Sequence, residues 1–223
     1  MKKTIGLVMA LILVLISLTG CVNINYEVKV NKNGSGDISY IYGFSKETLN
    51  SLQMTAEDMV KSMKEQATES NYTVETYEDD EIAGFKAQKH VDDLSSEMSM
   101  QEAFGEEYVK EKEGNGINIK KSLFTREYSQ NVQIDLTSLS ELGDSVKMTY
   151  RVTLPAKSKT NNATEVNGKE LTWNLKAGEV NQIEFTATGI NILPIIIIVL
   201  VVLVVAGAVI TFVILKKKKG TKK

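Results

Sequence analysis

The 223-residue sequence is poor in the residues that build covalent and metal frameworks, with one cysteine, one histidine and two prolines. A single cysteine excludes a disulfide framework and any zinc or iron–sulfur site with several cysteine ligands. A single histidine excludes histidine-rich metal sites. The sequence also contains neither a Gly-x-Ser-x-Gly nor a Ser-x-x-Lys nucleophile motif. We therefore expect a protein that is not an enzyme and that holds no cofactor or metal.

Charge is divided unevenly along the chain, although the total is close to neutral at -2, with 26 basic and 28 acidic residues. Residues 1–20 contain two lysines and residues 190–223 contain six, and neither segment contains an acid. Removing these eight lysines leaves 18 basic against 28 acidic residues in 21–189, a net charge of -10. Such an acidic central segment argues against nucleic-acid binding, because the phosphate backbone repels it.

The N-terminal segment, residues 1–20, has the organisation of a secretory signal peptide. Two lysines precede an apolar run that ends at Leu18, and small residues follow. The sequence Leu18-Thr19-Gly20-Cys21 resembles a bacterial lipobox, in which the chain is cut before the cysteine and its sulfur receives a diacylglycerol. We therefore expect a lipid on Cys21. The alternative is a signal anchor with an incidental cysteine, but the apolar run is short for a membrane span.

Residues 190–215 form an apolar segment, which a basic tail, residues 216–223, follows. From Ile195 to Leu215 only Thr211 is polar, and a helix of this length spans about 31 Å, close to the roughly 30 Å of a hydrocarbon core. A buried core helix is the alternative, but globular helices are rarely apolar on every face. The lysines predict a cytoplasmic tail by the positive-inside rule. Residues 21–189 are therefore expected to form one extracytoplasmic domain at the cell membrane.

The domain between the anchors shows the alternation of apolar and polar residues that is typical of half-buried strands. Helical spacing follows Ser45, a capping box begins at Thr55, and a weaker helix is indicated over residues 92–104. These features predict an α+β fold: an antiparallel β-sheet with two or three helices packed on one face, plus the C-terminal transmembrane helix. Strands are expected at residues 22–30, 38–44, 72–77, 82–91, 116–124, 128–136, 146–154, 171–175 and 183–187, and an exposed loop at residues 157–163.

Methionines concentrate in the expected helices, and they are the feature most suggestive of a ligand site. Methionine is adaptable and recurs on surfaces that receive varied apolar ligands. A cavity between the helices and the sheet, lined by Met59, Met63, Trp173 and Phe185, would suit an acyl chain. The alternative is that these side chains only pack the core.

The clustered carboxylates and the single histidine have simpler explanations than catalysis. Residues 79–81 and 92–93 lack the spacing of a calcium loop, so we interpret them as solvated turns, with a cation site as the alternative. His90 faces away from Phe85 and Ala87 in strand register, which predicts a position on the surface or at a sheet edge.

Both ends of the domain resemble the LppM-type lipoprotein domain of bacteria. At the start, residues 21–37 combine the lipobox cysteine, an alternating strand and a glycine-containing turn. At the end, residues 167–187 carry a glycine turn and the strand around Trp173, and a membrane helix follows. The resemblance covers residues 21–215 in layout, with matching residues clustered at the two ends. It implies an envelope-anchored α+β domain that binds lipids or glycolipids and has no catalytic residues.

Two functions of different class fit these features. The first is a non-enzymatic, membrane-anchored lipoprotein of the bacterial cell envelope that binds a lipid or lipid-linked ligand at the outer membrane face. The alternative is an accessory or sensor subunit that contacts an envelope protein complex through its acidic domain and its transmembrane helix. A domain with this charge is repelled by anionic lipid within a Debye length of about 8 Å. We therefore expect a lipid to enter by its tails and not through a basic patch, unless lysines such as Lys120 and Lys121 act locally.

Overall fold

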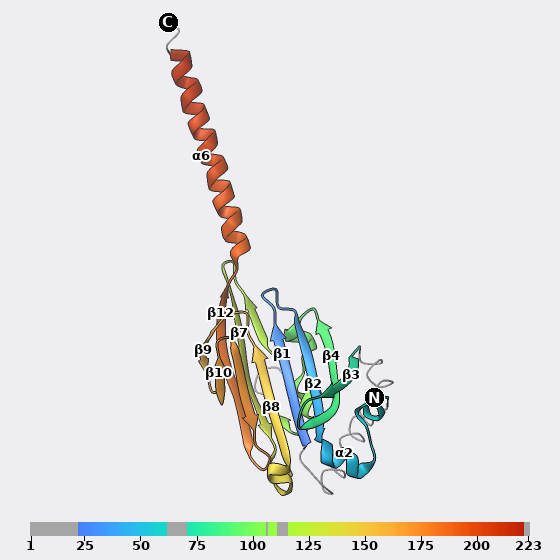
Figure 1. Cartoon of the computed structure of the whole chain (residues 1–223). Coiled ribbons are helices and arrows are strands. Elements are labelled where there is room, and N and C mark those ends of the chain that lie inside the picture. Colours follow the sequence, from blue (N-terminus) through green and yellow to red (C-terminus); the bar gives the residue numbers. More distant parts are fainter. Residues whose placement is uncertain (1–21, 62–70, 106, 111–115, 221–223) are drawn as a thin grey trace.

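The computed structural model describes residues 22–61, 71–105, 107–110 and 116–220. Its strands form two β-sheets packed face to face, and one long helix, α6 (Ile192–Gly220), extends away from them (Figure 1). The α+β fold class is confirmed, with mostly antiparallel sheets, few helices and a C-terminal apolar helix. The structure adds the division of the strands into two sheets, for which the sequence has no local signal.

The larger sheet has seven strands in the order β10-β11-β8-β1-β2-β4-β3. Neighbouring strands are antiparallel except β1 and β8, which run parallel and pair Val22 with Val146. The first strand of the chain is thereby joined at the centre of the sheet to a strand that follows more than 100 residues later. The bounds are β1 (Val22–Val30), β2 (Gly36–Ser45), β3 (Thr73–Glu78), β4 (Ile82–Val91), β8 (Val146–Thr153), β10 (Glu165–Asn167) and β11 (Glu170–Leu175).

The smaller sheet has the order β5-β7-β12-β9, and β6 also pairs with β7. Its bounds are β5 (Val109–Lys110), β6 (Asn118–Lys121), β7 (Thr125–Asp135), β9 (Ser158–Asn161) and β12 (Val180–Ile190). The expectation of a loop over residues 157–163 is therefore wrong in part, because β9 pairs with β12. This edge strand is polar and mostly exposed, so it has no apolar alternation that could reveal it.

The helices other than α6 are short, and the caps of α2 and α4 follow the sequence signals. Ser45 caps α2 (Lys46–Leu52) by accepting a hydrogen bond from the Thr48 backbone N–H at 3.2 Å. The capping box closes in both directions, because Thr55 Oγ1 accepts from the Asp58 N–H and Asp58 accepts from the Thr55 N–H. The helix over residues 92–104 is divided into α4 (Leu94–Glu97) and α5 (Met100–Phe104), and the 3₁₀ segment η1 (Thr137–Ser145) precedes β8.

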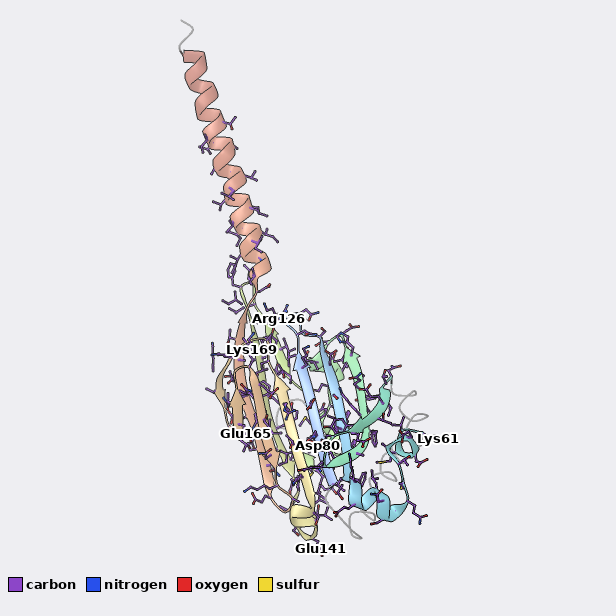
Figure 2. All side chains as sticks on the ribbon, in the orientation of Figure 1. Lys61, Asp80, Arg126, Glu141, Glu165 and Lys169 are labelled. Atoms are coloured by element: carbon purple, nitrogen blue, oxygen red, sulfur yellow. The ribbon has the colours of Figure 1, made fainter. Side chains whose placement is uncertain are left out.

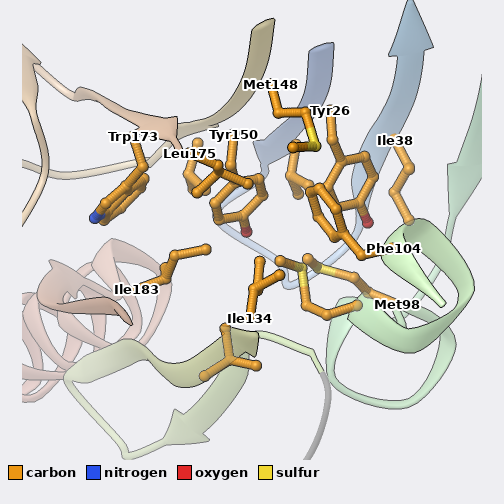
Figure 3. Packing of buried hydrophobic residues seen from close by; sticks show 14 of the residues in the cluster. Tyr26, Ile38, Met98, Phe104, Ile134, Met148, Tyr150, Trp173, Leu175 and Ile183 are labelled. Carbon is orange, nitrogen blue, oxygen red and sulfur yellow. The ribbon is translucent and has the colours of Figure 1, made fainter. Parts of the chain in front are cut away.

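A row of aromatic side chains crosses four neighbouring strands on the inner face of the larger sheet. Trp173, Tyr150, Tyr26 and Tyr40 lie directly opposite one another in register. Their successive ring centroids are 5.5, 5.4 and 4.7 Å apart, in stacked arrangements. Trp173, Tyr150 and Tyr26 face side chains such as Ile183 across the core (Figure 3). The row therefore forms one wall of the hydrophobic core.

The two sheets are also joined through this core by a polar contact. Tyr150 donates a hydrogen bond to the Oε1 atom of Gln130 in β7, at 2.8 Å, and both residues are buried. The Phe185 ring of β12 lies 6.0 Å from Trp173. Phe104 of α5 packs edge-on against Tyr26, with ring centroids 5.8 Å apart, so the short helices complete the core beside the smaller sheet.

Candidate functional site at the foot of the C-terminal helix

Helix α6 leaves the sandwich directly from the last strand. Strand β12 ends at Ile190 and α6 begins at Ile192, so one residue joins them. The backbone N–H of that residue, Asn191, donates to the carbonyl oxygen of Phe124 at 2.8 Å. The helix contains a segment, Pro194–Thr211, long and apolar enough to cross a membrane, and none of that segment is buried by the domain. The end of the sandwich from which α6 emerges is therefore the end nearest a membrane that α6 would span (Figure 1).

A groove of about 770 Å³ lies at this end of the sandwich, beside the start of α6. It is built from segments that are far apart in the sequence: the β1–β2 turn, the start of β7, the loop after β8, the turn before β11, and the β12–α6 junction. Its size falls within the range of small-molecule sites. The lining residues are Lys32, Asn33, Arg126, Tyr128, Pro155, Ala156, Lys169, Thr188, Gly189, Ile190, Asn191 and Ile192.

The β1–β2 turn brings Lys32 to the groove and is tied to the opposite sheet. Gly34 has φ +99°, a conformation that favours glycine, and the Asn31 N–H closes the turn on the Ser35 carbonyl oxygen at 2.9 Å. The Lys32 carbonyl oxygen accepts hydrogen bonds from the Tyr128 hydroxyl at 3.1 Å and from the Arg126 guanidinium. These contacts hold Lys32 and Arg126 beside each other across the open end of the sandwich.

The turn before β11 brings Lys169 to the other side of the groove. The Leu154 N–H donates to the Lys169 carbonyl oxygen at 2.9 Å. The Lys169 ammonium group in turn donates to the Pro155 carbonyl oxygen at 2.9 Å. Both contacts hold the loop after β8 against the turn, so the third cation of the groove has a defined position.

The charge of this groove is positive, unlike that of the domain as a whole. No carboxylate is among its lining residues, and within the described ranges none forms an ion pair with Lys32, Arg126 or Lys169. Arg126 and Lys169 lie near the start of α6, whereas Glu141 lies at the opposite end of the domain (Figure 2). The net charge of -10 did not reveal this local concentration of positive charge, and Lys120 and Lys121, the lysines that were expected to act locally, are not among the lining residues.

Exposed apolar side chains surround the groove on the side of α6. Leu123 and Phe124, in the turn between β6 and β7, are 63% and 44% exposed, and Ile190 is 66% exposed. The hydrogen bond from Asn191 to Phe124 places this turn at the start of α6. Exposed apolar side chains therefore lie between the groove and the apolar segment of α6.

Comparison with known proteins gives a family for the chain. The family model of the LppM domain matches residues 23–189. The chain belongs to the LppM domain family. Among solved structures, the NMR structure of the folded domain of Mycobacterium tuberculosis LppM is similar, with 15% sequence identity and a TM-score of 0.49 over 78% of this chain and 94% of that one. No curated protein matches the chain.

The described residues of the predicted apolar pocket, Met59, Trp173 and Phe185, are not among those that line this groove. Trp173 and Phe185 are brought together, but they are 3% and 0% exposed and belong to the core, where Trp173 Nε1 donates to Asn162 Oδ1 at 2.8 Å. Met59 is buried, and Met63 lies outside the described residues. A gap of about 20 Å³ beside Phe104 is too small for an acyl chain. The four-residue pocket stays a prediction.

The predicted lipid-bearing end of the LppM domain is opposite the groove. Cys21 and the lipobox residues Leu18, Thr19 and Gly20 lie outside the described residues. Val22, which follows Cys21, pairs with Phe44 and Val146, next to α2 and η1 at the end of the sandwich away from α6 (Figure 1). Strand β1 has nine residues and is about 26 Å long, so Val22 lies at least that far from the groove end.

The clustered carboxylates and His90 have structural roles in turns and caps. Asp79 accepts hydrogen bonds from the Glu81 and Ile82 backbone N–H groups at 2.9 Å, and these bonds hold its pKa below the usual value. Asp93 caps α4 by accepting from the Ser95 N–H. His90 is exposed, as expected, with Nδ1 2.6 Å from Asp37 Oδ1, and this hydrogen bond raises its pKa.

Sequence reasoning missed the groove, although part of its signal was present. Lys32 and Lys169 each lie in a glycine turn, and Arg126 lies at the start of a strand. Whether a turn residue lies at the same end of the fold as residue 190 can be predicted only when the strand directions are known. The parallel pairing of β1 with β8 sets those directions, and it joins residues more than 100 positions apart.

Proposed function

We propose that this protein is a non-enzymatic, membrane-anchored lipoprotein of a bacterial cell envelope that binds a lipid or lipid-linked ligand at the outer face of the membrane. The observation that carries the proposal is the position of the groove. It opens beside Ile190 and Ile192, where α6 begins. A molecule bound in the groove would therefore lie at the same level as the lipids around α6. A lipid headgroup can enter the groove while the acyl chains stay in the bilayer.

The composition of the groove supports a lipid more than a soluble metabolite. Pro155, Ala156, Ile190 and Ile192 are apolar, whereas the opposite walls carry cations and amides. A lipid offers both kinds of surface, with a polar headgroup above apolar glycerol and acyl groups. Binding at this site requires no acyl cavity inside the domain, and this removes the need for the predicted pocket at Met59 and Trp173.

The proposed topology places the domain outside the cell, with α6 crossing the membrane and residues 216–223 in the cytoplasm. A lipid on Cys21 is the second anchor. Because Val22 lies at the end opposite α6, both anchors can enter one bilayer only if the long axis of the sandwich lies along the membrane surface. The groove adjoins the bilayer in this orientation as well, since Asn191 and Ile192 are part of its lining.

Native mass spectrometry of the full-length chain released from lipid nanodiscs tests the proposed function. We expect the chain to retain one lipid per molecule more firmly than a control span consisting of α6 and the basic tail alone fused to an unrelated domain. Equal lipid retention by the two proteins would contradict lipid binding by the domain.

The alternative function, an accessory subunit of an envelope complex, rests on α6. None of the segment Pro194–Thr211 is buried by the domain, so its whole surface is available to a partner helix. Replacing residues 195–215 with an unrelated span separates the two functions, because the groove residues Ile190, Asn191 and Ile192 stay in place. Lipid binding at the groove should survive this replacement, whereas a partner contact inside the membrane should be lost.

A further inference from the structure

We propose that the groove selects lipids whose headgroup carries a negatively charged phosphate and no compensating cation. This inference rests on the proposed function and names the ligand class of the same groove. Three cations of independent origin, Lys32, Arg126 and Lys169, converge on it from the β1–β2 turn, from β7 and from the turn before β11. A neutral or cationic headgroup would leave these three cations without a negatively charged partner.

The three side chains keep donors available for a phosphate. A guanidinium group has five N–H donors, and Arg126 directs one hydrogen bond to the Lys32 carbonyl oxygen. An ammonium group has three donors, and Lys169 directs one to the Pro155 carbonyl oxygen. These backbone contacts hold both groups in place without neutralising their charge. The planar fork of arginine matches phosphate oxygens, and the lysines act as point charges beside it.

The absence of acids from the groove favours anionic headgroups over zwitterionic ones. No carboxylate lines it in the described part of the chain, so its positive charge is compensated only by what enters. A phosphate without a cation supplies that compensation. A zwitterionic headgroup brings a quaternary or primary ammonium into the same space, where three cations repel it. Anionic lipid is therefore favoured over zwitterionic lipid, although both contain a phosphate.

The depth of the groove favours a membrane lipid over a free phosphate compound. Ile192 precedes Ile195 by three residues, a rise of about 4.5 Å along α6. The polar layer on each side of a hydrocarbon core is about 5–7 Å thick. The groove therefore lies at the level of the headgroups, and the exposed Leu123 and Phe124 side chains adjoin the same layer. A lipid reaches the cations without leaving the bilayer.

The test compares the full-length chain in nanodiscs that contain equal amounts of phosphatidylglycerol and phosphatidylcholine, with bound lipids identified by native mass spectrometry. The site variant carries Lys32→Gln, Arg126→Gln and Lys169→Gln. The matched control carries Lys61→Gln, Lys147→Gln and Lys176→Gln, which remove the same charge away from the groove. All three proteins keep the basic tail, which also attracts anionic lipid, so the readout is the difference between them. Fluorescence of the buried Trp173, the single tryptophan, verifies that each variant is folded.

We expect the wild-type protein and the control to retain phosphatidylglycerol in preference to phosphatidylcholine, and the site variant to lose about 100-fold of that preference. Retention of both lipids with equal preference in all three proteins would overturn the selectivity and leave lipid binding standing. Retention of no lipid by the wild-type domain would overturn the proposed function itself. Soluble glycerol phosphate, offered at the same concentration as the lipid, is the probe for the ligand source. Retention of glycerol phosphate equal to that of phosphatidylglycerol would overturn the membrane as the source of the ligand.

Discussion

At the residue scale, the core of this domain depends on one buried polar pair among aromatic rings. The Tyr150 hydroxyl donates to Gln130 Oε1 at 2.8 Å, and the Gln130 Nε2 atom has no hydrogen-bond partner among the described residues. Burial raises the pKa of Tyr150 well above its usual value, so the hydroxyl stays protonated and remains a donor. The pair joins the two sheets within a core that consists mostly of apolar side chains.

Tyr150→Phe keeps the stacked ring and removes the donor. A buried acceptor without its donor costs about 1–3 kcal/mol, and we expect the free energy of unfolding to fall by that amount. Urea unfolding of the full-length chain in detergent, followed by Trp173 fluorescence, measures the change. Adding Gln130→Met replaces the second partner by an apolar side chain of similar shape and should restore most of the loss. No loss in the single variant would show that the pair contributes nothing.

The contact between His90 and Asp37 predicts a dependence of stability on pH. The hydrogen bond that His90 donates to the Asp37 carboxylate raises the folded-state pKa of His90 above its ordinary value of 6.5. Protonated His90 therefore stabilises the fold below about pH 6.5, and the contribution is lost as the pH rises through the raised pKa. Both side chains are half exposed, at 55% and 51%, so the effect is small. We expect Asp37→Asn to lower Tm more at about pH 5 than at about pH 9, and an equal change at both values would contradict the assignment.

At the element scale, the alternation of side chains predicted the strands of the larger sheet except β10, which is mostly polar and exposed. Strands β1 and β4 have the expected bounds, and β2 and β8 differ by one or two residues. Alternation succeeds there because one face of each strand is buried and the other is solvated. It failed for β9, which is polar on both faces. It also carried no information on pairing, so the two-sheet arrangement and the groove could not be predicted.

The pairing of β2 with β4 depends on a glycine that the sequence pattern did not single out. A side chain at Gly84 would place its Cβ atom 1.9 Å from the Tyr42 carbonyl oxygen of the neighbouring strand. Gly84→Ala therefore forces β4 away from β2, and we expect a loss of at least about 1–3 kcal/mol, the usual cost of overpacking. Gly207→Ala in α6, where no atom lies within 4 Å, is the control and should leave urea unfolding of the domain unchanged. Equal stability of both variants would contradict this close approach.

At the scale of the whole molecule, the anchors and the charges are distributed along one axis. The start of β1, which follows Cys21, is at one end, and α6 with the basic groove is at the other. In the proposed topology, a lipid on Cys21 would hold the domain along the membrane, whereas α6 alone would allow it to stand upright. The sequence predicts both anchors in one membrane, but it does not predict where each lies on the fold. Only the direction of β1, parallel to β8, separates them.

Removing the N-terminal lipid should change the orientation of the domain. Cys21→Ser, combined with a signal peptide that is cut without lipidation, leaves α6 as the sole anchor. A fluorophore introduced at Glu141, at the end away from α6, should then transfer less energy to an acceptor lipid than it does in the lipidated protein. A fluorophore at Ala156, in the groove, is the control and should change little. Unchanged transfer from Glu141 would show that the Cys21 end does not contact the bilayer.

The most direct test of the central claim, that a lipid occupies the groove at the foot of α6, is photo-crosslinking in membranes. p-Benzoylphenylalanine is introduced at Ala156, which lines the groove, or at Asn131 and Lys86 on the outer faces of the smaller and larger sheets. At most one outer face can meet the bilayer, so the two control positions account for either orientation of the domain. The account predicts a lipid adduct at Ala156 whose yield exceeds that at both controls. No adduct at Ala156, or equal yields at all three positions, would contradict it.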